Sequence, residues 1–309
     1  DTMPYGDKSS WSFDPLSPME KDGKIYGLGS TDMKGGLMAS IMAVKLIKDS
    51  GFELPCRVKI MSVADEEGGG NGTITAMMNK ESGDGAVVCE PSDNQILTAH
   101  MGFVFFKVSV KGVALHSAGK WNGVNAIEKA IELIRDLGEL EREWLMKYKH
   151  QILPPPTLNV GVINGGTAGS TVPDFCEFKV CVHYLPEIMS FEQVKKDFEE
   201  TIYLRSKGDK FLAKNTPEIE IYQQGSGFEI DKDDEFVEFV RKNSNEISDI
   251  PINGGIAGND ARLLKNIGKI PTVILGPGRL EDCHSIDESL DIEEYFKYIK
   301  IYVNLIINF

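Results

Sequence analysis

The sequence lacks the features that mark secreted, disulfide-stabilised and membrane-spanning proteins. Its five cysteines include no Cys-x-x-Cys pair, and their odd number argues against a closed disulfide framework. No apolar run approaches the roughly 18 residues that a membrane-spanning helix needs, and no signal peptide is recognisable. We therefore expect a cytoplasmic protein with no membrane partner.

Basic residues are fewer than acidic residues. The chain has 33 Lys and Arg against 47 Asp and Glu, a formal net charge of −14. A surface of this sign repels phosphate backbones, so nucleic acid is not an expected partner. A negative surface is also a common means of staying soluble, so the charge alone indicates no ligand.

The motifs of several other enzyme classes are missing as well. There is no His-Glu-x-x-His, no Gly-x-Ser-x-Gly and no phosphate-binding loop, and the glycine-rich residues 68–72 lack the lysine that such a loop needs. What is present is an ordinary balance of 41% hydrophobic and 26% charged residues in 309 residues. That length is enough for about two domains.

The first part of the chain alternates between helix and strand patterns. Residues 35–48 place apolar side chains at helical spacing, and residues 57–63 and 86–89 are short runs typical of strands. Three consecutive acids at 65–67 follow the first run, and Glu90 follows the second. Because ligands in open α/β sheets bind beyond the carboxyl ends of strands, these acids are expected where chemistry takes place.

The pattern changes in the middle of the chain and then returns. Residues 98–225 contain longer strand patterns and two helix patterns, which predict an inserted α+β domain. The strands are predicted over 104–113, 157–163 and 175–184, and the helices over 124–137 and 191–204. Residues 226–309 again alternate, with a strand over 269–275 and a closing helix from Ile292. We therefore predict an α/β domain formed by residues 1–97 and 226–309, interrupted by the insert.

A spaced set of acids and one histidine suggests a metal centre. The set is Asp32, Glu66, Glu67, Glu90 and His284. Zinc binds carboxylate oxygen and imidazole nitrogen, and a two-metal site needs a carboxylate that bridges both ions. A base must also take a proton from water, whose pKa zinc lowers from about 15.7 to roughly 7. Taken singly, each residue fits a plainer role, such as a helix N-cap for Asp32 or a solvated loop acid.

Five motifs in a fixed order favour the catalytic interpretation. They are Asp1-Thr2-Met3-Pro4, DGKIYGLGSTDMKGG at 22–36, DEEGG at 65–69, CEPS at 89–92 and DCHSIDE at 282–288. Together they resemble the zinc-dependent acylase and exopeptidase family of acetylornithine deacetylase, succinyl-diaminopimelate desuccinylase, aminoacylase and carboxypeptidase G. The resemblance covers nearly the whole chain. It implies an α/β zinc-exopeptidase-like catalytic domain with an inserted α+β lid and dimerisation domain.

The resemblance implies two divalent metal ions, zinc in the first place and cobalt as an alternative. Asp32 would bridge the two ions, Glu90 would complete the first site, and Glu67 with His284 would complete the second. The histidine of the first site is expected two positions before Asp1, so we expect a segment upstream of this sequence and one ligand outside it.

The resemblance also implies the catalytic groups. Glu66 would be the general base, and Asp1 would orient Asp32 or its neighbours. His116 matches a lid histidine that enters the active site of the partner subunit in this family and polarises the scissile carbonyl, so a homodimer is expected.

Two positions depart from the family pattern and put carboxylate recognition in doubt. Many relatives have Asn where this chain has Ser170, and Arg where it has His183. An arginine clamps a carboxylate with two parallel hydrogen bonds, which a histidine cannot reproduce. Arg262 remains a candidate anion contact, with a helix-surface arginine as the plainer interpretation.

The function that these features predict is a metal-dependent amidohydrolase. Its substrate would be a small N-acyl amino acid or related amide, from which it removes the acyl group. A dipeptidase or aminopeptidase of the same family is an alternative, because the same metals and base cleave any amide that the lid admits. A non-catalytic dimeric descendant is a further alternative, although the presence of both Glu66 and Glu67 argues against it.

Overall fold

The protein forms two compact units in a computed structural model that describes residues 1–309. The first unit contains Asp1–Ala99 and Phe228–Phe309, and the second contains His100–Gly227. The insert predicted over residues 98–225 differs from the second unit by two residues at each end. None of the helices is both long and apolar enough to span a membrane.

The first unit is built on a mixed sheet with the strand order β11-β4-β13-β3, and β12 lies beside β4. Strand β3 runs parallel to β13 and has no strand on its other side, whereas β4 is antiparallel to β13. The bounds are β3 (Ala86–Val88), β4 (Ile96–His100), β11 (Phe228–Glu229), β12 (Ile252–Gly255) and β13 (Thr272–Ile274). The strands predicted around β3 and β13 are therefore present but shorter than expected.

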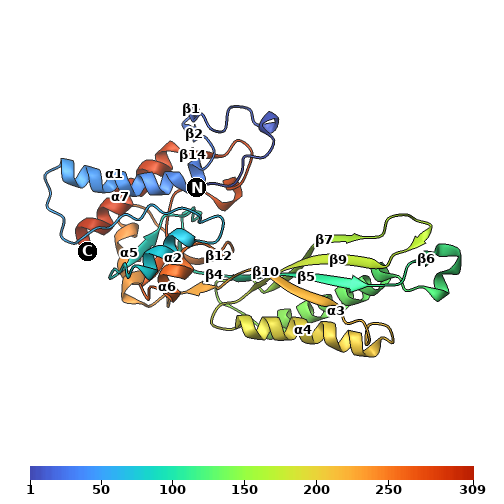
Figure 1. Ribbon diagram of the computed structural model, residues 1–309. Helices are drawn as coiled ribbons and strands as arrows, with labels where there is room; N and C mark the ends of the chain where they lie inside the picture. Colours follow the sequence, from blue (N-terminus) through green and yellow to red (C-terminus); the bar gives the residue numbers. More distant parts are fainter. The chain divides into compact units, whose positions relative to one another are not determined.

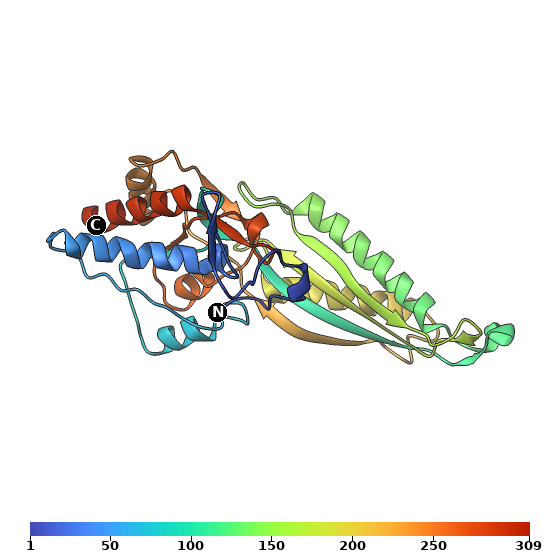
Figure 2. The ribbon, with the colours of Figure 1, turned by 90° about the horizontal axis from the view of Figure 1, so that it is seen from above.

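Helices cover this sheet. They are α1 (Gly35–Asp49), α2 (Asn71–Met78), α5 (Glu235–Asn245), α6 (Ala261–Asn266) and α7 (Ile292–Asn308). Helices α1 and α7 lie side by side in both views (Figures 1 and 2), and α2 contacts α6. The helix predicted over 35–48 and the closing helix predicted from Ile292 are confirmed. Apolar side chains from the helices and strands form one core, in which Ala43, Val273 and Tyr298 are fully buried.

A small three-stranded sheet joins two distant parts of the chain. It consists of β1 (Met19–Lys21), β2 (Lys24–Tyr26) and β14 (Ser289–Asp291), with β2 in the centre. This pairing brings the segment before α1 next to the segment after His284, although the two are more than 250 residues apart in sequence.

The strand predicted over residues 57–63 is wrong. This segment pairs with no strand, and no backbone hydrogen bond joins residues 53–63 to the rest of the chain. A strand is defined by its ladder of hydrogen bonds to a neighbour, so an apolar run without a neighbour forms no strand. The acids at 65–67 still follow the segment directly.

The second unit is an antiparallel sheet with two helices. Its strand order is β10-β5-β9-β7, with β5 (Gly102–Lys111), β7 (Thr157–Gly165), β9 (Phe175–Tyr184) and β10 (Glu218–Gly225). Helices α3 (Ala126–Lys147) and α4 (Phe191–Gly208) pack on one face of this sheet (Figure 1). Phe106 of β5 stacks on Phe198 of α4 with ring centroids 3.9 Å apart. The three strands and the two helices predicted here are confirmed, with shifted ends.

Helix α3 is ten residues longer at its C-terminus than predicted. It begins after Asn125, whose side chain caps the backbone N–H groups of Ile127 and Glu128. It continues through Gly138 because Leu140 and Trp144 extend the buried apolar stripe against the sheet. Tertiary packing therefore overrides the weak helix propensity of one glycine.

A short pair of strands lies at one end of the second unit. Strands β6 (Leu115–His116) and β8 (Thr171–Val172) pair in antiparallel fashion, and a short helix (Ser117–Asn122) follows β6. In Figure 1 this pair lies where β9 begins, at the end of the long strands.

Candidate metal and catalytic site

Helix α1 packs closely against the end of strand β3, and this packing positions Asp32. A Cβ atom on Gly36 would lie 2.0 Å from the carbonyl oxygen of Cys89, so only glycine permits this packing. The turn that contains Asp32 consequently lies at the carboxyl end of β3, where Glu90 follows. The glycines of the 22–36 motif thus bring two acids together.

Three side chains converge beyond this strand end. The Nε2 atom of His284 lies 3.2 Å from Oδ2 of Asp32 and 3.2 Å from Oε2 of Glu67. One ligand atom from each residue lies within 4.8 Å of the others. His284 has a φ of 56°, a left-handed conformation that is uncommon outside glycine and clusters at functional sites. Two carboxylates and one imidazole match the three protein ligands of a catalytic zinc site.

Glu90 adds a fourth donor beside Asp32. Its carboxyl group is buried, and its Oε1 atom has no hydrogen bond. Burial raises its pKa well above the usual value, and the nearby charges of Asp32 and Glu66 raise it further. Burying a carboxylate without a counter-charge is costly, so a cation beside Asp32 and Glu90 would relieve the site. The donors of this site therefore fit divalent metal ions.

Glu66 has the properties of a proton acceptor. Burial raises its pKa to about 8, the charges of Asp260, Glu67 and Asp32 add to the shift, and Arg262 opposes it. A base is most effective when its pKa lies near the working pH. Asp1 contacts the site through a hydrogen bond that its Oδ1 atom accepts from the backbone N–H of Glu66 at 3.3 Å.

Glu288 has a structural role, although it was not among the predicted site residues. This buried carboxylate accepts hydrogen bonds from the backbone N–H groups of Gly29, Thr31 and Asp32, at 2.7, 2.8 and 2.9 Å. It therefore fixes the turn that carries Asp32 without facing the metal cluster. Its position in the 282–288 motif was the available signal, but nothing in the sequence identified its partners.

Asp260 was also missed. It is buried beside Glu66, accepts a 2.6 Å hydrogen bond from Oγ1 of Thr73, and its Oδ1 atom has no partner. Burial raises the pKa of Asp260 as well. A second buried carboxyl group thus lies within electrostatic reach of the expected base.

Arg262 is engaged by the protein itself. It is buried, and its guanidinium donates to the carbonyl oxygens of Asn259 and Gly69 at 3.0 Å each. These bonds hold the glycine-rich turn that follows the expected base. These bonds use two of the five guanidinium N–H donors, so Arg262 also holds the backbone at the position where an anion contact was predicted.

The remaining predicted residues lie in the second unit, at opposite ends of its sheet. His116 and Ser170 are close together, because the N–H of Ser117 donates to the carbonyl oxygen of Ser170 at 2.8 Å. His183 lies at the far end of β9, half-buried and 3.5 Å from Oγ1 of Thr157. Burial lowers the pKa of His183, so it is neutral near pH 7.

Comparison with known proteins identifies the family. Residues 1–308 match the family model described as Peptidase family M20/M25/M40. The chain belongs to this family. It is 31% identical to an N-formyl-4-amino-5-aminomethyl-2-methylpyrimidine deformylase of Bacillus subtilis, covering 100% of this chain and 77% of the relative. It is 30% identical to an acetylornithine deacetylase of Proteus mirabilis, covering 94% and 73%.

Solved structures support the same fold. An M20 family metallo-carboxypeptidase of Sulfolobus solfataricus, Sso-CP2, superposes with a TM-score of 0.80 at 20% identity, covering 99% of this chain and 82% of that one. A tripeptidase of Staphylococcus aureus gives a TM-score of 0.76 at 21% identity, covering 94% and 76%. The predicted family and the α/β class are thereby confirmed. The M20 protein is a hydrolase that acts on C–N bonds, and the non-catalytic alternative falls away.

Proposed function

We propose that this M20 amidohydrolase removes a formyl or other small acyl group from an N-acyl amine. The observation that carries the proposal is the convergence of Asp32, Glu67 and His284 beside the buried Glu66. It occurs in a chain that is 31% identical to a deformylase over its whole length. In the reaction the oxygen of water bonds to the acyl carbon, the C–N bond breaks, and a carboxylic acid and a free amine leave.

We propose two divalent metal ions, with zinc first and cobalt as the alternative. Asp32, Glu67 and His284 would hold one ion, while Asp32 and Glu90 would contribute ligands to the other. Bound ions of this kind polarise the acyl carbonyl and acidify water.

Glu66 performs the proton transfers in this proposal. It takes a proton from the attacking water and delivers it to the nitrogen of the leaving amine. A carboxyl group whose pKa lies near neutrality exchanges protons readily in both directions, and the burial of Glu66 provides this property.

The substrate that we favour carries no carboxylate next to its amide. His183 is neutral near pH 7 and stands where the resemblance described above implies a carboxylate-binding arginine. Arg262 already donates to two backbone carbonyl groups. A neutral imidazole cannot offer the two parallel charge-assisted hydrogen bonds that clamp a carboxylate, and Arg262 is partly committed to the backbone. An N-formyl aminomethyl heterocycle, the kind of compound named for the Bacillus subtilis relative, meets this condition.

A substrate panel tests this choice. We expect kcat/KM of the protein to be at least about tenfold higher for an N-formyl amine without a carboxylate than for N-acetylornithine or a dipeptide. His183→Arg should narrow that difference by improving the carboxylate substrates, whereas His183→Gln, which adds no charge, should not. Faster turnover of N-acetyl amino acids or of dipeptides by the unmodified protein would rule out this substrate class.

We also propose a homodimer in which His116 serves the partner's site. His116 and His183 lie at opposite ends of β9, and the eight residue steps from Phe175 to His183 span roughly 25 Å of strand. Within one subunit, the two histidines are therefore too far apart to contact one small substrate. A partner subunit that contributes His116 would allow both to serve one site.

Mixing two inactive variants tests the dimer. Each subunit of a Glu66→Gln and His116→Ala heterodimer retains one intact half, so one of the two sites has both groups. With random exchange, activity should recover to about a quarter of the unmodified level. Absence of recovery, with exchange demonstrated by differently tagged subunits, would show that His116 acts within its own chain.

A further inference from the structure

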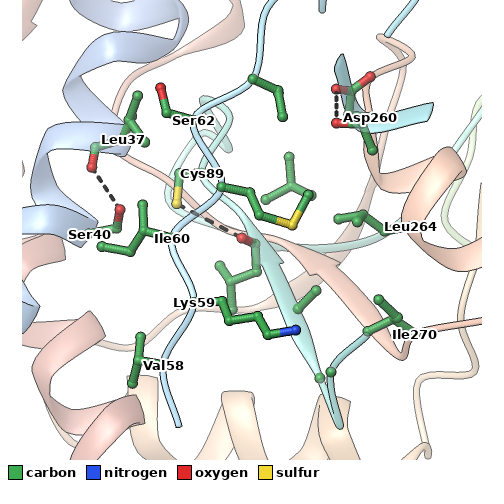
Figure 3. A pocket seen from close by; sticks show the side chains of 18 of the residues that line it. Leu37, Ser40, Val58, Lys59, Ile60, Ser62, Cys89, Asp260, Leu264 and Ile270 are labelled. Carbon is green, nitrogen blue, oxygen red and sulfur yellow. Dashed lines mark hydrogen bonds between the residues drawn. The ribbon is translucent and has the colours of Figure 1, made fainter. Parts of the chain in front are cut away.

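His284 is the most exposed member of the metal cluster and gains little support from packing. Its side chain is 50% exposed, whereas those of Asp32 and Glu67 are 16% and 17% exposed. Asp32 and Glu67 also line a cavity of about 890 Å³ in the first unit, part of whose wall is shown in Figure 3, and His284 does not line it. The position of its imidazole therefore depends on the backbone of the turn that carries it.

The turn that carries His284 has a strained backbone. His284 and Asp287 have φ angles of 56° and 59°, in the left-handed region that residues other than glycine seldom occupy. Left-handed residues persist only where the surrounding contacts determine their conformation. Contacts between residues 282–288 and the rest of the chain are therefore needed to keep the imidazole in place.

Two neighbouring carboxylates at the end of this turn bind different segments of the chain. Glu288 accepts hydrogen bonds from the backbone N–H groups of the turn that contains Asp32. Asp287 accepts two hydrogen bonds from Ser12, one from the backbone N–H to Oδ1 at 2.8 Å and one from the hydroxyl to Oδ2 at 2.6 Å. Because one residue binds both oxygens, the position and the orientation of the Asp287 carboxylate are restricted.

Ser12 is held in place by the residues on either side of it. Trp11 is buried, and its indole N–H donates to a backbone carbonyl oxygen at 2.8 Å. The ring of Phe13 packs edge-on against Trp11 and Tyr26, with centroids 5.7 and 5.5 Å away. Tyr26 belongs to β2, which pairs with β14, the strand that follows the His284 turn. The two donor groups of Ser12 consequently have a fixed position relative to this turn.

We propose that Ser12 and Asp287 position the imidazole of His284 for metal binding. Both residues lie outside the cluster of ligand atoms and act by holding the left-handed turn at its C-terminal end. Hydrogen bonds that fix the orientation of a metal ligand are typically worth roughly 10- to 100-fold in metal affinity. The proposal rests on the metal centre proposed above and adds two positioning residues to it.

Zinc affinity, measured by competition with a chelating dye, tests the proposal. Asp287→Ala should weaken zinc binding by roughly tenfold or more. Asp287→Asn should bind zinc almost as tightly as the unmodified protein, because its amide oxygen still accepts the N–H of Ser12 and its NH₂ group can donate to the hydroxyl. Ser12→Ala removes only the hydroxyl bond and should give an intermediate loss. Adding Ser12→Ala to Asp287→Ala should cause no further loss, since the partner is already absent.

Cobalt(II) spectra separate positioning from general stabilisation. The visible absorption of bound cobalt(II) depends on the geometry of its ligands, so Asp287→Ala should change this spectrum, whereas a loss of fold stability alone would not. Asp14 lies on the same segment as Ser12 but pairs with Lys8. Asp14→Ala is therefore the matched control, and it should change neither the zinc affinity nor the spectrum.

His284→Ala distinguishes failure of this proposal from failure of the metal centre. If His284→Ala binds zinc as tightly as the unmodified protein, the metal centre itself is wrongly assigned. If His284→Ala weakens zinc binding but Asp287→Ala and Ser12→Ala leave the affinity and the cobalt spectrum unchanged, the positioning role is overturned. An equal loss in Asp287→Asn and Asp287→Ala would also overturn it, because the charge of Asp287 and not its hydrogen bonds would then support metal binding. If Asp287→Ala does not fold, Ser12→Ala decides by the same two measurements.

Discussion

Replacement of Glu66 by Gln should lower kcat of the protein by roughly a hundredfold to ten-thousandfold, with its metal content unchanged. Glutamine keeps the shape of the side chain but cannot accept a proton. The buried environment that raises the pKa of Glu66 to about 8 suits a proton-transfer group. Steady-state kinetics on the best substrate of the panel, together with metal analysis of the same samples, measures both quantities.

Two further substitutions make this result specific. Glu67→Gln removes a carboxylate that lies 3.2 Å from His284, so this variant should lose metal as well as activity. Glu81→Gln alters an exposed acid that pairs with Lys59 and should change neither. If Glu66→Gln loses metal to the same extent as Glu67→Gln, Glu66 is a ligand and the assignment of the base fails.

The elements with a strong local signal could be predicted from the sequence. Helix α1 has apolar residues at helical spacing, and strands β5 and β9 alternate clearly, so their period alone identifies them. Residues 57–63 have the same apolar character, yet they form no strand. Strand formation depends on a neighbour in space, and a single-sequence pattern does not contain that neighbour.

The functional site likewise contains residues that the sequence identifies and contacts that it does not. The acids and His284 could be chosen because their chemistry suits a metal and because their motifs occur in a family order. The supporting contacts could not be chosen in this way. Glu288 acts on backbone N–H groups that lie more than 250 residues earlier, and Asp260 meets Thr73 across 187 residues. Such pairs have no local spacing, so only the folded chain reveals them.

The metal-free protein should become less stable as the pH rises from 6.5 to 8. The folded state holds a proton on Glu66 up to a pKa of about 8, while the unfolded state releases it near 4.5. Between these values the folded state binds more protons, so a rise in pH favours unfolding. Glu90 shifts in the same direction. Glu66 should lower the free energy of unfolding by on the order of 1 kcal/mol per pH unit, and Glu90 should add to the fall.

Urea unfolding of the protein with EDTA and with added zinc measures this effect. A cation beside the carboxylates favours their charged forms, so zinc should stabilise the protein more at pH 8 than at pH 6.5. In EDTA, Glu66→Gln should flatten the fall in stability with pH. A fall of the same size in that variant would show that Glu66 does not hold the proton.

Groups whose titration would oppose this decline in stability change their charge mainly outside the range from pH 6.5 to 8. Burial lowers the pKa of His183, so its contribution to stability increases with pH, but only up to its unfolded value near 6.5. Exposed acids such as Asp14 and Glu238 have lowered pKa values through hydrogen bonds to Lys8 and Arg241, and they lose their contribution only at acidic pH. Buried thiols such as Cys89 titrate above pH 9. Between pH 6.5 and 8 the buried carboxyl groups are therefore the main source of a declining stability, and a rise instead of a fall would mean that they are ionised in the folded protein without metal.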